Sequence, residues 1–301
     1  MIKSTIIIFF VLLIMYSFLV EAFNPNWNTA QHQWQSNIIK AQRYLYEDSE
    51  CMQNVIIGTS LSNRLSMDHL PIMYNMTFDG LYIYDGLYVL TKKKVLPKKV
   101  FIEMNYVYSS ENKEFIASIG SPAIIYARGV CPMLRDQYQP IGLICNIVSE
   151  KMTRHIINQF NKFIPVTGAS AGGLGEDLFN KMLSHQLLNY SKVPDAEMLS
   201  YCFGNLKRYV AILEKGGVNV TFFEMPVNEQ LCNMPKAKVA RENFFKYFPP
   251  NKYQYIDIPN CSEYKTADGV HLTSEEALRY TDYFRDKIID MKILAFTNTV
   301  N

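Results

Sequence analysis

Two short segments of the sequence carry residue types that could cooperate in nucleophilic catalysis. The first is Gly58-Thr59-Ser60, which directly follows a short apolar run, and the second is Asp268-Gly269-Val270-His271, near the other end of the chain. A histidine can take the proton of a serine hydroxyl, while an aspartate fixes the tautomer of the imidazole and stabilises the imidazolium. Ser60, His271 and Asp268 therefore form a candidate nucleophile, base and orienting group.

Each of these residues also has a purely structural interpretation. Ser60 can cap a following helix, Asp268 can be a turn residue before glycine, and His271 can be an ordinary histidine near a helix start. The catalytic interpretation gains weight because all three residue types of a triad occur together. In addition, a serine between a strand and a helix would stand at the carboxyl edge of a sheet, where a helix N-terminus favours developing negative charge.

Ser170 is a rival nucleophile, because residues 168–172 fit the Gly-x-Ser-x-Gly elbow of α/β-hydrolases. That elbow needs a strand before the serine and a helix after it. The preceding residues 163–166 contain Pro165 and make a poor strand, although residues 174–188 could form the helix. We therefore favour Ser60 and interpret residues 168–172 as a flexible loop.

The rest of the chain predicts an α/β fold, with a five-stranded parallel sheet between two layers of helices. Short runs rich in Val, Ile, Tyr or Phe alternate with longer helical stretches, which is typical of a parallel sheet with helices on its faces. The predicted strands are Asn54–Ile57, Tyr74–Phe78, Val100–Met104, Asn219–Phe223 and Gln254–Ile258. Helices are predicted over Glu197–Lys215 and Ser274–Met291.

The last predicted helix has a clear start and a clear buried face. Thr273 can cap it, and Glu276, three residues on, can return the hydrogen bond. The residues that form its apolar stripe are Ala277, Tyr280, Phe284 and Ile288.

Residues 106–194 do not fit the simple alternation and predict a long helical insertion between the third and fourth strands. Its helical candidates are Ile141–Phe160 and Glu176–Leu188. Such a segment could form a lid or a partner surface beside the sheet. The expected organisation is thus an N-terminal segment, residues 1–22, followed by one catalytic domain, residues 23–301, that carries the insertion.

The N-terminal segment predicts export. Lys3 precedes an apolar run that is short for a bilayer span of about 20 residues, and Val20-Glu21-Ala22 resembles a signal-peptidase site. Cleavage after Ala22 is the favoured reading, and an uncleaved anchor is the alternative. In both cases the six cysteines would lie outside the cytosol, where disulfides can form.

Composition excludes several other classes of protein. The 301 residues are 49% hydrophobic, which is incompatible with a disordered chain, and 30 Lys+Arg against 28 Asp+Glu give no field that would attract nucleic acid. The other histidines, among them His69, do not pair at metal-ligand spacing, and no glycine-rich phosphate loop follows a strand. We therefore predict no metal, no cofactor and no nucleic-acid partner.

The two chemical segments resemble the blocks that open and close the domain of the SGNH, or GDSL-type, hydrolase superfamily, and the resemblance spans residues 54–287. It implies a flavodoxin-like fold. It also implies that Gly80, in Phe78-Asp79-Gly80, and Asn105 donate to the oxyanion, together with the N–H of Ser60. Losing one such donor typically costs about 3 kcal/mol of transition-state stabilisation.

Three residues depart from the usual blocks: Thr59 replaces an aspartate, and Glu103 and Tyr106 replace the glycine and aspartate around Asn105. With the export segment and the insertion, they make the chain similar to the branch that moves acyl groups on cell-surface polymers, such as alginate and peptidoglycan O-acetyltransferases and the D-alanyl transfer protein of teichoic acids. This implies an exported enzyme that acts on an acylated small molecule or polysaccharide, with a membrane protein as acyl donor. The alternatives are a simple secreted esterase or lipase and a non-catalytic glycan-binding or scaffold protein.

Overall fold

The computed structural model describes residues 2–23, 33–139 and 175–293. The chain divides into two compact units. One comprises residues 1–47 and 114–170, and the other comprises residues 48–113 and 171–301. The second unit contains the sheet and all five residues that the sequence singles out for catalysis.

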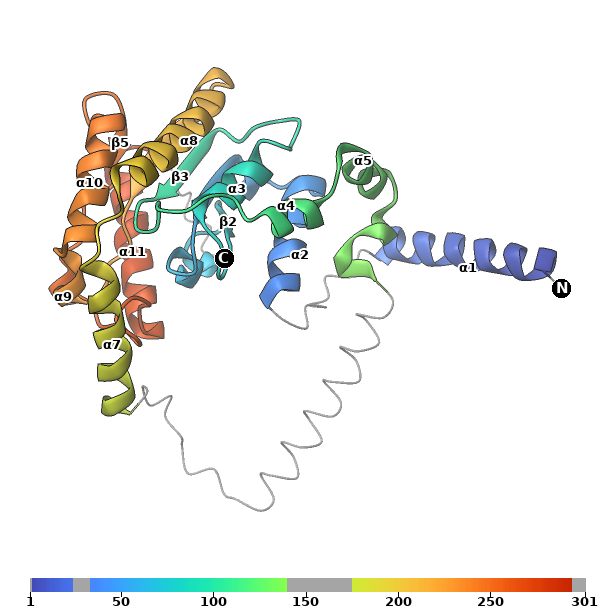
Figure 1. Ribbon diagram of the computed structural model, residues 1–301. Coiled ribbons are helices and arrows are strands. Elements are labelled where there is room, and N and C mark those ends of the chain that lie inside the picture. Colours follow the sequence, from blue (N-terminus) through green and yellow to red (C-terminus); the bar gives the residue numbers. More distant parts are fainter. Residues whose placement is uncertain (1, 24–32, 140–174, 294–301) are drawn as a thin grey trace, which may run out of the picture. The chain divides into compact units, whose positions relative to one another are not determined.

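The second unit is built on a five-stranded sheet in which every pair of neighbouring strands is parallel. The strands are β1 (Asn54–Gly58), β2 (Tyr74–Thr77), β3 (Lys99–Glu103), β4 (Asn219–Phe223) and β5 (Gln254–Tyr255). Their order across the sheet is β2-β1-β3-β4-β5. Figure 1 labels β2, β3 and β5 within this sheet. From β1 the chain adds β2 on one side and then β3, β4 and β5 on the other, so the strand order reverses between β1 and β3. Open α/β sheets bind ligands at such a point, outside the carboxyl ends of the strands.

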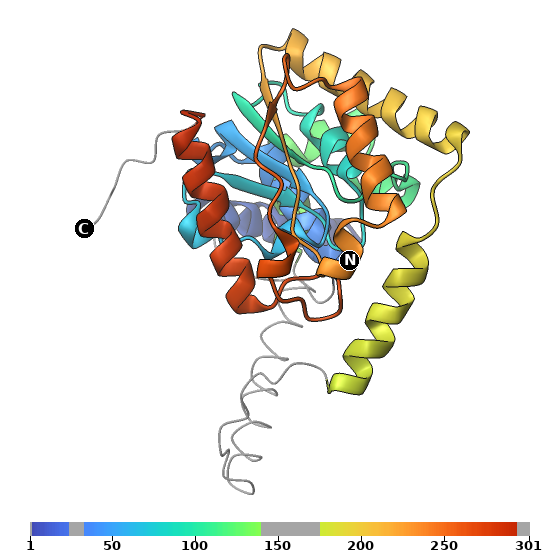
Figure 2. The same cartoon turned by 90° about the vertical axis from the view of Figure 1, so that its left-hand side faces the viewer.

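Helices cover both faces of this sheet. They are α3 (Ile83–Leu90), α8 (Ala196–Lys215), α10 (Pro235–Tyr247) and α11 (Ser274–Asp290). Successive residues of β4 point to opposite faces. The Phe222 ring lies 5.4 Å from that of Phe244 in α10, and the Phe223 ring lies 4.9 Å from that of Phe284 in α11. Figure 2 shows α11 on one side of the strands and α8 and α10 on the other. The predicted three-layer α/β fold is therefore confirmed.

The predicted helices over residues 197–215 and 274–291 correspond to α8 and α11. In α11 the predicted stripe is buried, and the Thr273 hydroxyl accepts the N–H of Glu276 at 3.4 Å. The carboxylate of Glu276 lies 2.7 Å from Arg279. Thr273 therefore caps the helix with its side chain, as predicted, whereas the Glu276 carboxylate forms an ion pair with Arg279 one turn further along.

Strand β5 is shorter than expected, because it ends at Tyr255 rather than Ile258. It is the edge strand of the sheet, and Pro259, which lacks an N–H, follows closely. Within the predicted insertion the described helices are α4 (Lys113–Ile119), α5 (Pro122–Val130) and α7 (Glu176–Tyr190). The predicted helix over residues 141–160 and Ser170 lie outside the described residues.

The first unit contains α1 (Ile2–Phe23) and α2 (Gln33–Tyr46), together with α5 and most of α4. The rings of Trp34 and Phe115 meet edge to face at 5.9 Å, and the Gln42 side chain accepts the backbone N–H of Asp136 at 2.8 Å. Helix α1 exposes large apolar side chains along its length, such as Ile7 and Phe18. Among the described residues, none of the helices meets the length and hydropathy needed to cross a bilayer.

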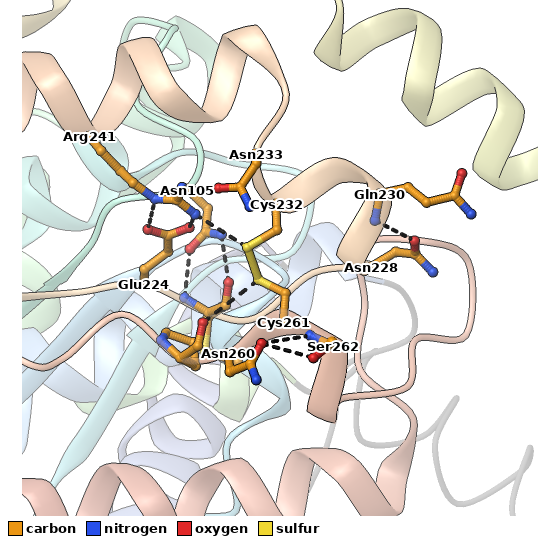
Figure 3. Close-up of a disulfide and its surroundings, with 12 residues drawn as sticks. Asn105, Glu224, Asn228, Gln230, Cys232, Asn233, Arg241, Asn260, Cys261 and Ser262 are labelled. Atoms are coloured by element: carbon orange, nitrogen blue, oxygen red, sulfur yellow. Dashed lines mark hydrogen bonds and ion pairs between the residues drawn. A yellow bond between two sulfur atoms is a disulfide. The ribbon is translucent and has the colours of Figure 1, made fainter.

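One disulfide joins Cys232, at the end of α9 (Glu229–Cys232), to Cys261 (Figure 3). Both residues are buried in the core cluster that also contains Phe223 and Phe284. The thiols of Cys51, Cys131 and Cys202 are free. The disulfide therefore ties the chain after β4 to the loop that leads toward Asp268.

Candidate active site

Ser60, His271 and Asp268 form a continuous chain of hydrogen bonds. The Ser60 Oγ lies 2.8 Å from His271 Nε2, and His271 Nδ1 lies 2.6 Å from Asp268 Oδ2. Ser60 comes from the turn after β1, whereas Asp268 and His271 come from the loop before α11. The fold thus brings together residues that are 211 positions apart in the sequence.

Asp268 is held in an environment that keeps it ionised. Burial opposes ionisation, but the hydrogen bonds from the His271 ring and from the backbone N–H groups of His271 and Val270 outweigh it and lower the pKa of Asp268 to about 2. An ionised carboxylate accepts the proton of Nδ1, which leaves Nε2 as an acceptor for the Ser60 hydroxyl. This is the tautomer that a general base for Ser60 requires.

The loop that carries His271 is shaped by a glycine and a short backbone pairing. Gly269 has a φ of 95°, a conformation that L side chains rarely adopt. The Ala267 N–H donates to the His271 carbonyl at 2.7 Å, beside the Thr266–Leu272 bridge. A Cβ on Gly269 would lie 3.1 Å from Leu183 of α7, so that helix packs directly on the turn. The backbone pairing with residues 266–267 and the packing of α7 against Gly269 therefore both hold the loop that carries His271.

The turn that carries Ser60 differs from the sequence-based prediction. No α-helix starts there. Instead, two 3-10 turns follow, Ser62–Arg64 and Met67–His69, and the first ends at Leu65 in an extended conformation. The expectation that a helix N-terminus lies beneath Ser60 is therefore wrong, since three-residue turns do not build a helix dipole.

A buried carboxylate occupies the space under this turn. Glu103, the last residue of β3, has no exposed surface, and its oxygens accept hydrogen bonds from Thr59 and Ser62, the neighbours of Ser60 and Leu61. A Cβ on Gly58 would lie 2.0 Å from Ser62 Oγ and 2.5 Å from Glu103 Oε2. Only glycine therefore fits at Gly58, which explains the first residue of the Gly-Thr-Ser run.

The sequence analysis treated Thr59 and Glu103 only as departures from a family pattern and missed that they bind each other. One signal was available. Glu103 ends an otherwise apolar buried strand, and a charged residue in such a position needs hydrogen-bonding partners. The partners themselves, 41 to 44 residues away, could not be read from spacing.

Ser60 and Gly80 are the two residues whose backbone N–H groups the family resemblance predicts as oxyanion donors. Within the described part of the chain, the N–H groups of Ser60 and Gly80 donate no hydrogen bond. Gly80 has a φ of 72°, so it turns the chain after Phe78 in a conformation that favours glycine. The Asn63 amide donates to Asp79 at 2.9 Å, which ties the Gly80 turn to the segment after Ser60.

Asn105 is oriented by the backbone of Met225. Its Nδ2 donates to the Met225 carbonyl and its Oδ1 accepts the Met225 N–H, both at 2.8 Å. Figure 3 shows this pairing beside the two-pronged ion pair of Arg241 with Glu224. A side-chain amide has two N–H donors, so one remains for another acceptor. Asn105 therefore has a fixed orientation and a single donor to offer.

Two other residues considered in the sequence analysis, His69 and Tyr106, have hydrogen-bond partners other than Ser60, His271 and Asp268. The Nδ1 of His69 lies 2.8 Å from Oδ1 of Asp282 in α11, so this histidine pairs with a residue other than Ser60. The Tyr190 hydroxyl donates to that of Tyr106 at 3.3 Å, and burial raises the pKa of Tyr106 to about 12. Among the described residues, no group of three or more His, Cys, Asp or Glu is arranged to hold a metal ion.

Comparison of the chain with protein-family models gives no match, and comparison with curated proteins gives none either.

Proposed function

We propose that this protein is an exported, serine-dependent enzyme of the SGNH type that transfers or hydrolyses small acyl groups, such as acetyl, on cell-surface glycans. The observation that carries the proposal is the hydrogen-bond chain from Ser60 through His271 to Asp268, with Ser60 at the carboxyl end of β1. It supports acyl chemistry because each member has the partner that its role needs.

The reaction begins when Ser60 Oγ attacks the acyl carbonyl carbon while His271 Nε2 takes the hydroxyl proton. The N–H groups of Ser60 and Gly80, with the remaining N–H of Asn105, donate to the oxygen that becomes anionic. As the tetrahedral intermediate collapses, the bond to the leaving oxygen breaks and His271 returns its proton there, which leaves the acyl group on Ser60. Asp268 stabilises the imidazolium throughout.

The second half of the reaction decides between transfer and hydrolysis. His271 deprotonates either water or a sugar hydroxyl, whose oxygen attacks the carbonyl carbon of the acyl-enzyme. When the bond to Ser60 Oγ then breaks, His271 returns the proton to that oxygen and Ser60 is regenerated. We favour transfer, because Thr59, Glu103 and Tyr106 resemble the acyltransferase branch more than secreted lipases. A glycan hydroxyl held beside the acyl-enzyme gains a large effective concentration and can compete with water.

Export is supported by two features of the described residues. Helix α1 presents large apolar side chains to its surroundings, as an export signal or anchor does, and Cys232 is bonded to Cys261. N-terminal sequencing of exported material tests this part. A chain that begins at Phe23 would support a cleaved signal, and a retained Met1 would support the anchor.

Turnover of p-nitrophenyl acetate, together with labelling by a fluorophosphonate probe, tests the enzymatic activity. Wild-type protein should release p-nitrophenol and take up the probe, whereas folded Ser60→Ala should do neither. His271→Ala should lose turnover to a similar extent, because members of a triad act as a unit. Glycan binding without turnover or labelling would refute the enzyme and leave a binding protein. Release of acetate alone with every polysaccharide offered would make the protein an esterase.

A further inference from the structure

The buried carboxylate of Glu103 binds the Ser60 turn on both sides of the nucleophile. The Thr59 N–H donates to Oε2 at 2.9 Å and the Thr59 hydroxyl to Oε1 at 2.9 Å. The Ser62 hydroxyl donates to Oε2 at 2.5 Å and the Ser62 N–H at 3.3 Å. Four donors from residues 59 and 62 therefore converge on one side chain, and Ser60 lies between them.

The two N–H groups can only donate and the two hydroxyls are placed to donate as well, so the two oxygens of the Glu103 carboxyl group serve as their common acceptors. Burial raises the pKa of Glu103, and the hydrogen bonds from Ser62 and Thr59 oppose that rise. The Thr59 hydroxyl completes the arrangement, because it also accepts the Leu61 N–H at 3.3 Å. In residues 59–62, the N–H groups of Thr59 and Ser62 donate to the carboxylate and that of Leu61 donates to the Thr59 hydroxyl, which leaves the N–H of Ser60 available to an oxyanion.

We infer that Glu103 is a positioning residue for the nucleophile: its carboxylate shapes the Thr59–Ser62 turn so that the Ser60 hydroxyl meets His271 and the Ser60 N–H points outward. This inference rests on the proposed function, because it assigns Glu103 a part in the same site. The sequence predicts that the N-terminus of an α-helix orders the turn around Ser60, and we infer that the Glu103 carboxyl group orders it instead. It touches no reacting atom and acts through Thr59 and Ser62.

The loss of this carboxylate has a specific expected effect on kinetics. Without it, the N–H groups of Thr59 and Ser62 lose their acceptor, and the Ser62 hydroxyl can turn to the Thr59 carbonyl, which already lies 3.4 Å away. The turn then relaxes and Ser60 moves relative to His271. A displacement of about 1 Å at a reacting group can cost about 100-fold in rate. Because Glu103 has no exposed surface, it cannot contact the ester itself, so kcat should fall while KM stays nearly constant.

Glutamine is the informative replacement, because three of the donors meet at a single oxygen, Oε2. A glutamine can present its carbonyl oxygen there, and its amide can donate to the Thr59 hydroxyl, which would then act as acceptor. Glu103→Gln should therefore retain much of the turn, whereas Glu103→Ala cannot. A residue needed only to fill space would also be rescued by glutamine, so a variant pair that keeps the Glu103 side chain must separate hydrogen bonding from packing.

The test compares Glu103→Ala, Glu103→Gln, Thr59→Val and the matched control Thr59→Ser in the full chain. Thr59→Val keeps the shape but removes the hydroxyl, while Thr59→Ser keeps the hydroxyl. For p-nitrophenyl acetate, Glu103→Ala should lower kcat about 100-fold with KM within about twofold. The kcat of Glu103→Gln should be at least tenfold higher than that of Glu103→Ala, and the kcat of Thr59→Val should be lower than that of Thr59→Ser. If Glu103→Ala does not fold, the comparison of kcat between Thr59→Val and Thr59→Ser tests the inference.

Hydrogen exchange of the peptide that spans residues 58–65 separates this inference from the proposed function. Faster exchange there in Glu103→Ala or Thr59→Val, with unchanged exchange in α8, supports the positioning role. It does so even if the wild type hydrolyses no ester, in which case only the proposed function fails. If the wild type is active but folded Glu103→Ala matches it in kcat, or Thr59→Val matches Thr59→Ser in both measurements, the positioning role is refuted.

Discussion

Replacement of Asp268 by asparagine should abolish base catalysis while leaving the loop intact. The asparagine oxygen can still accept the N–H groups of Val270 and His271, which lie 3.0 and 2.8 Å from Asp268 Oδ1. Its NH2 group then faces His271 Nδ1 and donates to it, so the ring proton moves to Nε2. An Nε2 that carries a proton cannot accept one from Ser60.

The magnitude follows from this change of tautomer. Acylation of Ser60 should slow by about 10⁴-fold, or about 5.5 kcal/mol in activation free energy. The effect on stability should be smaller. The difference between the ordinary pKa of 3.8 and about 2 corresponds to at most about 2.4 kcal/mol. The carboxylate is 17% exposed, and solvent screening lowers this to about 1–2 kcal/mol.

The pH dependence of stability has a defined sign. Because folding lowers the pKa of Asp268, its contribution is fully present above about pH 4 and is lost as pH falls toward about 2. The difference in unfolding free energy between wild type and Asp268→Asn should therefore shrink across that window. Denaturant titration at several pH values measures it.

Stopped-flow acylation by p-nitrophenyl acetate is the assay for the rate. Asp282→Asn is the matched control, since Asp282 makes a similar contact with His69 at 2.8 Å on the surface, and it should acylate like the wild type. A folded Asp268→Asn that acylates within tenfold of the wild type would show that the Asp268–His271 contact does not set the tautomer, and the mechanism would be refuted.

Three further changes test other parts of the site. Gly80→Ala should slow acylation and destabilise the fold by about 1 kcal/mol, because Gly80 has a φ of 72°; wild-type rates would remove it from the oxyanion site. Asn63→Ala should slow acylation with an unchanged Tm, and an unchanged rate would show that its bond to Asp79 does not position Gly80. Cys232→Ser removes the disulfide that closes a 29-residue loop, so it should lower the unfolding free energy by about 3–4 kcal/mol in denaturant titrations. Wild-type protein with its disulfide reduced should be as unstable as the variant. A variant as stable as the disulfide-bonded wild type would contradict this.

The sheet was predictable from sequence because its strands are short apolar runs. The prediction for β4, residues 219–223, matches the structure at both ends. The predictions for β1 and β2 differ by one residue at the carboxyl end, and that for β3 is shifted by one residue at both ends. Strand β5 was predicted too long, because at the sheet edge only Gln254 and Tyr255 pair with β4. Apolar runs indicate where a strand can form, but they do not show how many residues of an edge strand pair with its single neighbour.

The triad segments could be found in the sequence, whereas the support beneath Ser60 could not. Ser60 and His271 stand in short motifs, and spacing within Asp268-x-x-His271 suggests contact directly. The turn after Ser60 is instead determined by Glu103, which belongs to another strand, so local propensity predicted a helix where 3-10 turns form. Long-range hydrogen bonds of this kind leave no periodic trace in the sequence.

The proposed function predicts an acyl-enzyme on Ser60, and mass spectrometry of the protein quenched after brief exposure to an activated acetyl ester would detect it. Peptide mapping should locate one acetyl group on Ser60, and the group should be absent from Ser60→Ala and nearly absent from His271→Ala. Addition of the correct glycan should discharge it faster than buffer. An acetyl group on another residue, such as Ser170, or turnover without any acylated intermediate on Ser60, would contradict the account.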